Sequence, residues 1–175
     1  MKIKDRLVLG LISGLIGSIP KTIIDEISLR KKISQRSFRE TAAGIWVNKH
    51  KEAKNLKGQI LGGIFDTGMS MLGGNILVQI LSKTGRDHSI TKGLFFGTTY
   101  GSIVTAMLSG FSSNKVRPKD AASNLSYVLS HAVYGITTSI AVAKLGDSSL
   151  FDTKPENDYL APTKPTTEQI KLASK

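Results

Sequence analysis

The chain has 175 residues, about the length of one domain, and its 24 Lys and Arg against 13 Asp and Glu give a net charge of +11. It contains no cysteine, which excludes a disulfide scaffold, a thiolate metal site and a cysteine nucleophile. An apolar content of 40% suits an ordinary soluble protein, but the charges are spread unevenly along the chain.

Four stretches that are nearly free of charge predict membrane-crossing helices, because each approaches the roughly 20 helical residues that a bilayer core requires. Segments this long without turn signals exceed typical strands. A soluble helical domain is the alternative, but the third stretch lacks the charged face that a soluble bundle helix needs. We therefore expect an all-α, polytopic membrane protein that forms a compact bundle of four transmembrane helices. These helices are expected near 7–27, 58–82, 92–111 and 124–145.

The first stretch also resembles a secretory signal peptide, because Lys2, Lys4 and Arg6 precede an apolar run. A cleavage site needs small residues at fixed spacing, and the segment 17–20 matches that pattern poorly. We therefore interpret this stretch as a retained helix.

Small residues recur four apart within the apolar stretches, an arrangement that lets two membrane helices approach closely. The expected helix-packing ridges consist of Gly10, Gly14, Gly93, Gly97 and Gly101. In a soluble helix this glycine content would be costly, at about 1 kcal/mol per residue relative to alanine.

The connection 25–59 is polar and strongly basic, and its middle is mildly apolar. Trp46 beside basic residues is typical of a membrane–water interface. Ser37 with Glu40 three residues later predicts a capping box. We expect a short interfacial helix over 37–54, with anionic lipid headgroups as partners of the basic connection. An amphipathic helix packed on the protein's own surface is the alternative.

Four spans would place both termini on one side of the membrane and the connection 25–59 on the other. The local charges around the first span nearly balance, but more basic residues lie on the side of 25–59. Because basic loops stay cytoplasmic, we predict that this connection is cytoplasmic and that both termini are outside.

The chain after the last apolar stretch changes in composition. It contains Pro155, Pro162 and Pro165 among mixed charges and has little apolar content. Such a segment buries too little apolar surface to become ordered. The expected domains are therefore a transmembrane domain over 1–146 and a disordered polar tail over 147–175.

Two ionisable residues inside expected spans form the candidate polar site. Asp66 lies in the second span, and intramembrane acids are candidates for cation binding or proton relay. His131 lies in the fourth span, which enters from the same side, so the two residues could face each other and titrate together. The alternative is that both are merely buried and hydrogen-bonded. Lys21 and Asp25 lie four residues apart, which favours an ion pair at the end of the first span.

Motifs for catalysis, phosphate binding and metal binding are absent from the sequence. The three histidines, at positions 50, 88 and 131, are scattered. We therefore expect no enzyme activity, no cofactor and no metal site. Basic residues beside membrane spans reflect topology more simply than nucleic-acid binding, so we expect no nucleic-acid partner.

Several short motifs occur in a fixed order along the chain. They are the glycine-rich first span ending in Pro20-Lys21, the segments 82–88 and 92–97, and His131-Ala132-Val133-Tyr134-Gly135. Taken in order, they resemble a family of small, functionally uncharacterised four-span membrane proteins of Gram-positive bacteria. The resemblance covers roughly residues 1–146 and implies an integral membrane protein with no assigned activity and no catalytic residues. The segment 40–43 departs from the family pattern, in which an acidic–aromatic pair precedes alanine.

Two functions remain open for a multi-pass protein of the cell membrane. The first is a structural or interaction bundle, with the lipid bilayer as its surroundings and a second copy of the chain as a candidate partner. The second is a small transporter, channel or holin-like pore with Asp66 and His131 on a proton or cation path. The thin, glycine-packed helices leave little room for an aqueous path, which favours the first.

Overall fold

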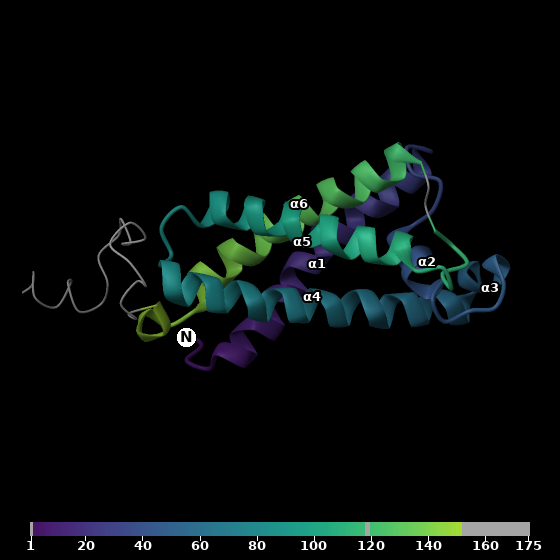
Figure 1. The fold of residues 1–175 in the computed structure, drawn as a ribbon. Helices are drawn as coiled ribbons and strands as arrows, with labels where there is room; N and C mark the ends of the chain where they lie inside the picture. Colours follow the sequence, from purple (N-terminus) through teal and green to yellow (C-terminus); the bar gives the residue numbers. More distant parts are fainter. Residues whose placement is uncertain (1, 118–119, 152–175) are drawn as a thin grey trace, which may run out of the picture.

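The computed structural model describes residues 2–117 and 120–151, and this part of the chain is helical without a strand. Four long helices form the bundle, and shorter ones lie at its two ends (Figure 1). The elements are α1 (Arg6–Arg30), α2 (Phe38–Ala43), α3 (His50–Lys54), α4 (Leu56–Thr84), α5 (Ser89–Gly110), α6 (Ala121–Leu145) and the 3-10 turn η1 (Ser148–Phe151).

Short polar residues set where the helices begin. The side chains of Asp5, Asn55 and Asp120 accept a hydrogen bond from the backbone N–H three residues ahead, as N-caps do. Helix α4 ends at Gly85, whose φ of 82° is accessible to glycine at little cost. The helix boundaries thus follow from local chemistry as well as from the apolar runs.

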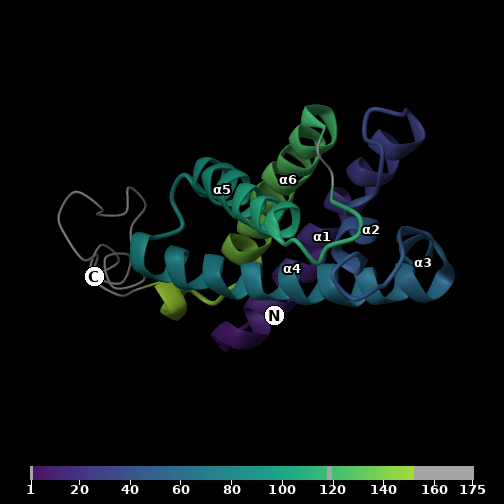
Figure 2. The same cartoon turned by 45° about the vertical axis from the view of Figure 1, so that its right-hand side comes forward.

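Successive long helices run in alternating directions along the bundle (Figures 1 and 2). At one end the N-terminal segment meets the end of α6, where the Ile3 N–H donates to the Leu145 carbonyl at 2.9 Å. At the other end the connection after α1 meets the start of α6, where the Gln35 N–H donates to the Ser123 hydroxyl. Helices α4 and α6 therefore run in the same direction.

Three helices of the described chain, α1, α4 and α6, are long and apolar enough to cross a membrane. The prediction of four such helices is therefore wrong in number. Helix α5 overlaps the predicted span 92–111, beginning at Ser89 and ending at Gly110, but its composition falls short of that of a candidate span. Glycine, serine, threonine and Tyr100 dilute its apolar residues. The absence of charged residues therefore suggested a higher hydropathy than this helix has.

The bundle exposes many large apolar side chains, and its interior combines apolar clusters with buried polar and charged residues. Ile19, Ile64 and Phe95 are 60%, 67% and 75% exposed. In contrast, Lys21 and Asp66 are buried, as are many serines and threonines. Charged residues are almost never fully buried in soluble proteins unless they are paired. Large apolar side chains exposed in this number on the long helices suit a surrounding apolar phase.

Two seams of small residues bring helix backbones together. In the α1–α4 seam, a Cβ at Gly14 would overlap the Ser70 carbonyl, and Gly10 lies against Asn75. In the α5–α6 seam, a Cβ at Gly97 would overlap the His131 carbonyl. The other two glycines of the expected ridges, Gly93 and Gly101, also face α6. Close backbone approach therefore requires glycine in both seams.

The single helix expected over 37–54 is two short helices, α2 and α3, joined by a turn. Ser37 caps α2 as predicted, since its hydroxyl accepts from the Glu40 N–H at 3.1 Å. The chain turns at Gly44, where a Cβ would overlap the Asn114 side chain. Helix α2 is largely buried, while Trp46 in the turn is exposed. The expected amphipathic helix lying along a surface is therefore replaced by the buried helix α2 and the short helix α3, which pack at one end of the bundle.

The first residues of the expected disordered tail are ordered. Leu150 and Phe151 of η1 are buried in an apolar cluster with Leu9 and Leu77. The Arg86 guanidinium lies over the Phe151 ring at 4.8 Å from its centroid. One aliphatic and one aromatic side chain, Leu150 and Phe151, thus extend the folded domain past its predicted end at 146. The rest of the expected tail, 152–175, lies outside the described residues.

Candidate functional site: a buried charge cluster

The centre of the bundle contains an ion pair that joins α1 to α4. The Lys21 ammonium contacts the Asp66 carboxylate, and both residues are buried, with exposed fractions of 3% and 5%. Lys21 also donates to the Ser70 hydroxyl at 3.0 Å. Taking two charges out of water costs several kcal/mol for each ion unless the geometry and extra hydrogen bonds compensate. Here the pair and the serine supply both.

Aromatic rings complete the surroundings of the lysine. Its ammonium lies 5.3 Å from the centroid of the Phe38 ring and 5.7 Å from that of the Tyr134 ring. Both distances are within the range of a cation–π interaction, which strengthens when the cation is desolvated. The Tyr134 hydroxyl donates to the Ser70 carbonyl at 2.6 Å. Four elements, α1, α2, α4 and α6, thus meet around one ammonium group.

Asp25 does not pair with Lys21 as the spacing predicted. Instead, one of its carboxylate oxygens accepts a hydrogen bond from the Phe38 N–H at 2.8 Å, which fixes the start of α2 against α1. Its other oxygen, Oδ1, is buried without a hydrogen-bond partner. The sequence rule for residues four apart is wrong here because Lys21 faces α4, where Asp66 offers a full countercharge.

His131 lies in the same polar interior but does not bond to Asp66. Its Nδ1 lies 2.7 Å from the Tyr127 carbonyl, one helical turn away. Its ring packs edge-on against Phe38 at a centroid distance of 4.9 Å. Phe38 contacts both His131 and Lys21, so His131 is linked to Asp66 only through Phe38 and Lys21. Whether they act together functionally remains a hypothesis.

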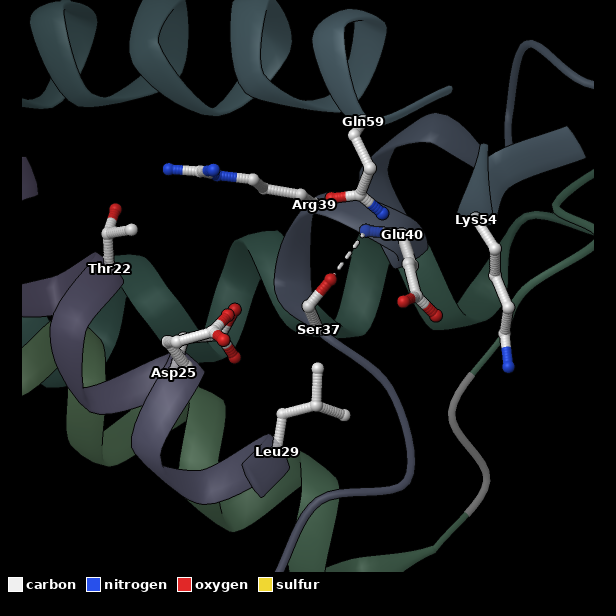
Figure 3. A pocket seen from close by; sticks show the side chains of 9 residues that line it. Thr22, Asp25, Leu29, Ser37, Arg39, Glu40, Lys54 and Gln59 are labelled. Atoms are coloured by element: carbon white, nitrogen blue, oxygen red, sulfur yellow. Dashed lines mark hydrogen bonds between the residues drawn. The ribbon is translucent and has the colours of Figure 1, made fainter. Parts of the chain in front are cut away.

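A cavity of about 270 Å³ opens beside this cluster, at the end of α1 (Figure 3). It is lined by residues of α1, α2, α3 and α4, and Asp25 and Glu40 contribute carboxylates to it. Burial raises the pKa of the Glu40 carboxyl above its ordinary value. One Glu40 oxygen, Oε2, is buried without a hydrogen-bond partner. Asp25 and Glu40 therefore both line the cavity, while the unpartnered oxygen of each is closed to solvent.

The arrangement has two chemical capacities. The ion pair can hold α1 and α4 in register, because neither charge can leave its partner at this depth without a large cost. The series Asp25, Lys21 and Asp66 also carries groups that can exchange protons or contact a cation, and it begins at the cavity. Within the described residues, no group of three or more potential ligands could hold a metal ion.

Sequence reasoning selected Asp66 but missed its partner. The available signal was the presence of two opposite charges, Lys21 and Asp66, in two different apolar stretches. Intramembrane charges tend to pair with one another, so the residues could have been matched across helices. No sequence signal indicated the cavity, because α1, α2, α3 and α4 build it together.

Comparisons with other proteins provide no further assignment: no protein-family model, no curated protein and no solved structure matches this chain.

Proposed function

We propose that this protein is a multi-pass helix bundle of the cell membrane with a structural or interaction role. The main observation behind this proposal is that large apolar side chains of the long helices are exposed while Lys21 and Asp66 are enclosed. A membrane supplies the apolar phase that such faces require. The glycine seams support the same proposal, since membrane helices associate through small residues.

The path of α5 follows from this proposal. Helices α4 and α6 are both candidate spans and run in the same direction. The chain must therefore return across the membrane between them, and α5 is the segment that connects their opposite ends. Its seam with α6 through Gly97 and Gly135 supports it there. Helix α5 thus crosses because of connectivity, although its composition alone is too polar.

Membrane extraction tests the placement. The protein should stay in the pellet after alkaline carbonate washing of membranes and should dissolve only with detergent. Recovery in the soluble fraction after lysis without detergent would refute the proposal. A peripheral protein bound only through its basic segment 25–59 would be released by carbonate or high salt. Release under either condition would therefore also contradict the proposed membrane placement.

The orientation is a separate part of the proposal. With four crossings, the basic connection 25–59 is cytoplasmic and rests against anionic headgroups, and both termini are outside. A C-terminal reporter that is active only in the cytoplasm should then be inactive. An active reporter would reverse the orientation without affecting the bundle.

Proton or cation transport is the second candidate function, and the cavity favours it. Asp25 lines the cavity and lies one helical turn from Lys21, the partner of Asp66. A reconstituted flux assay should show leakage that Asp66→Asn abolishes if this candidate is correct. Absence of flux from both proteins favours the structural role. A holin-like pore would instead leak larger solutes and depend on association of several copies.

The resemblance to small uncharacterised four-span proteins of Gram-positive bacteria stays a proposal. It agrees with a membrane bundle of this size and supplies no activity. The sequence predicts no enzyme activity, no cofactor and no nucleic-acid partner, and it leaves a second copy of the chain as a candidate partner.

A further inference from the structure

The two ends of the bundle differ in charge. At the end where α2 and α3 lie, the described residues outside the four long helices include nine basic and three acidic side chains. We call this group, residues 31–55, 111–117 and 120, the basic end. The described residues outside the long helices at the opposite end include three of each. That opposite group consists of residues 2–5, 85–88 and 146–151. An excess of positive charge on one end favours a negatively charged partner there.

Hydrogen bonds join the parts of the basic end to one another. The Lys115 N–H donates to the Gly44 carbonyl at 2.9 Å, and the Arg36 guanidinium donates to the Arg117 carbonyl at 2.7 Å. The connection between α5 and α6 is thereby held against the segments on both sides of α2. The basic end is therefore one surface that forms when the chain folds, because its parts are far apart in the sequence.

Large apolar side chains are exposed on the same surface. Trp46, Ile33 and Phe111 are 62%, 52% and 44% exposed. Lys115 is exposed as well, and its backbone bonds to Gly44, two residues before Trp46. At a membrane interface, tryptophan rings lie at the level of the headgroups and lysines contact anionic lipids. The basic end presents both kinds of side chain together.

The basic end lies where three candidate spans have an end. Helix α1 ends there at Arg30, α4 begins at Leu56 and α6 begins at Ala121, and α2 and α3 lie beside these helix ends (Figure 1). In the proposed membrane placement, this level is that of the headgroups. A soluble polyanion would neutralise the lysines and arginines but would leave the exposed apolar side chains in water. An anionic bilayer surface suits both.

We propose that the basic end is a binding surface for anionic phospholipid headgroups, with Trp46 and Phe111 inserted among them. The inference rests on the proposed membrane placement. It extends the headgroup contact from the connection 25–59 to the α5–α6 connection and adds a lipid preference. Anionic lipid is enriched at this end of the bundle, whichever side of the membrane the end occupies. Because the surface exists only in the folded chain, bound anionic lipid also stabilises the fold.

The fluorescence of Trp46 tests this proposal, because the chain contains a single tryptophan. The full chain is reconstituted in phosphatidylcholine liposomes that contain increasing fractions of a brominated lipid, which quenches tryptophan on contact. Half-maximal quenching should require an about fivefold lower fraction of brominated phosphatidylglycerol than of brominated phosphatidylcholine, since about 1 kcal/mol of attraction gives that enrichment. High salt should reduce the difference, because it screens exposed charges.

Paired variants assign the preference to this end. Lys49→Gln with Lys115→Gln removes two exposed ammonium groups from the basic end and should lower the preference for phosphatidylglycerol. Lys4→Gln with Lys144→Gln is the matched control, because it removes two exposed ammonium groups near the opposite end. The control should keep the preference of the unmodified protein. Added phosphatidylglycerol should also raise the unfolding midpoint in detergent more for the control than for the first variant.

Three results would overturn the proposal. Equal quenching by the two brominated lipids at low salt would remove the preference for anionic lipid. An equal loss of preference in Lys4→Gln with Lys144→Gln would reduce it to an effect of net charge. Absence of quenching by either lipid would place Trp46 in water, and a change in its emission on adding heparin would then assign the surface to a soluble polyanion.

Carbonate washing of the same liposomes separates this inference from the proposed placement. A protein that resists carbonate but shows no lipid preference refutes only the anionic-lipid surface. A protein that carbonate releases refutes the membrane placement itself.

Discussion

The α1–α4 seam and the α5–α6 seam use the same small residues but hold their helices together differently. Both bring backbones close at glycines, Gly14 in the first seam and Gly97 in the second. The first seam also carries the buried pair Lys21–Asp66. The second seam contains no ion pair among the described residues, and its polar contacts are neutral, such as the Ser139 hydroxyl donating to the Ser89 carbonyl.

This difference separates two sources of specificity. Glycine contact fixes how closely two helices approach and depends on shape alone. A single buried charge pair fixes the register as well, because a shift of one helical turn would leave both charges unpaired. The α1–α4 seam should therefore be sensitive to loss of charge and to loss of shape, and the α5–α6 seam to loss of shape only.

Breaking the ion pair should have the largest effect. Lys21→Met or Asp66→Asn leaves one buried charge without its countercharge, and we expect a loss of about 3–5 kcal/mol in the free energy of unfolding. The double variant Lys21→Met with Asp66→Leu should recover much of that loss, since it removes both charges. Unfolding in detergent, followed by circular dichroism, measures these changes. Lys51→Met on the exposed face of α3 is the control, and a loss there of similar size would contradict the account.

Disturbing shape alone should have the next largest effect, and it should appear in the α5–α6 seam. Gly97→Ala places a methyl group against the His131 carbonyl, and overpacking of this kind costs about 1–3 kcal/mol. Gly68→Ala in α4 meets nothing within 4 Å. There the gain in helix propensity should stabilise the protein by about 0.5–1 kcal/mol. The same unfolding measurement compares the two variants. If both changed the free energy of unfolding in the same direction, the α5–α6 seam would not depend on close approach.

Removing the cap of α2 should have a smaller effect. Ser37→Ala removes the acceptor for the Glu40 N–H, and loss of such a cap costs about 1 kcal/mol. Because α2 supplies Phe38 to the ring contacts around Lys21, the loss of stability should weaken the α1–α4 seam and leave the α5–α6 seam unchanged. Ser37→Asp restores an acceptor and should recover stability. If Ser37→Asp is as unstable as Ser37→Ala, the cap is not the cause.

The pH dependence of stability should be the smallest effect. Burial raises the pKa of Glu40 above its ordinary 4.5. The native state therefore keeps this proton at a pH where the unfolded chain has lost it, and stability falls as pH rises from about 4.5 through the native pKa. Glu40→Gln should remove this part of the decline. Unfolding midpoints of the two proteins measured across mildly acidic pH provide the test, and parallel curves would contradict it.

The sequence predicts the four long helices because apolar runs are local signals. The caps at Asp5 and Asn55 are further local signals, which the apolar runs alone do not include. Local signals do not determine which faces meet. The pairing of Lys21 with Asp66, instead of Asp25, depends on the rotation of α1 against α4. That rotation is set by Gly14 and its neighbours together.

The sequence is less informative where composition is intermediate. Freedom from charge made α5 look like a fourth candidate span, but serine and threonine lower its hydropathy. Mild apolarity over 37–54 suggested one amphipathic helix, whereas Gly44 ends α2 against Asn114. The polar composition after residue 146 concealed Leu150 and Phe151, two apolar residues that join the core. In the last two cases a tertiary contact overrides the local average.

Thiol labelling in membranes tests the central claim, that lipid covers the outward apolar faces, most directly. The chain contains no cysteine, so an introduced one reports alone. Ile64→Cys and Phe95→Cys lie on the most exposed apolar surface of α4 and α5, and Lys51→Cys lies on the exposed face of α3. In permeabilised membranes a water-soluble maleimide should label Lys51→Cys, because thiols react as thiolates in water. Ile64→Cys and Phe95→Cys should stay unlabelled until the membrane is dissolved in denaturing detergent. Labelling of both at the rate of Lys51→Cys would contradict the membrane placement.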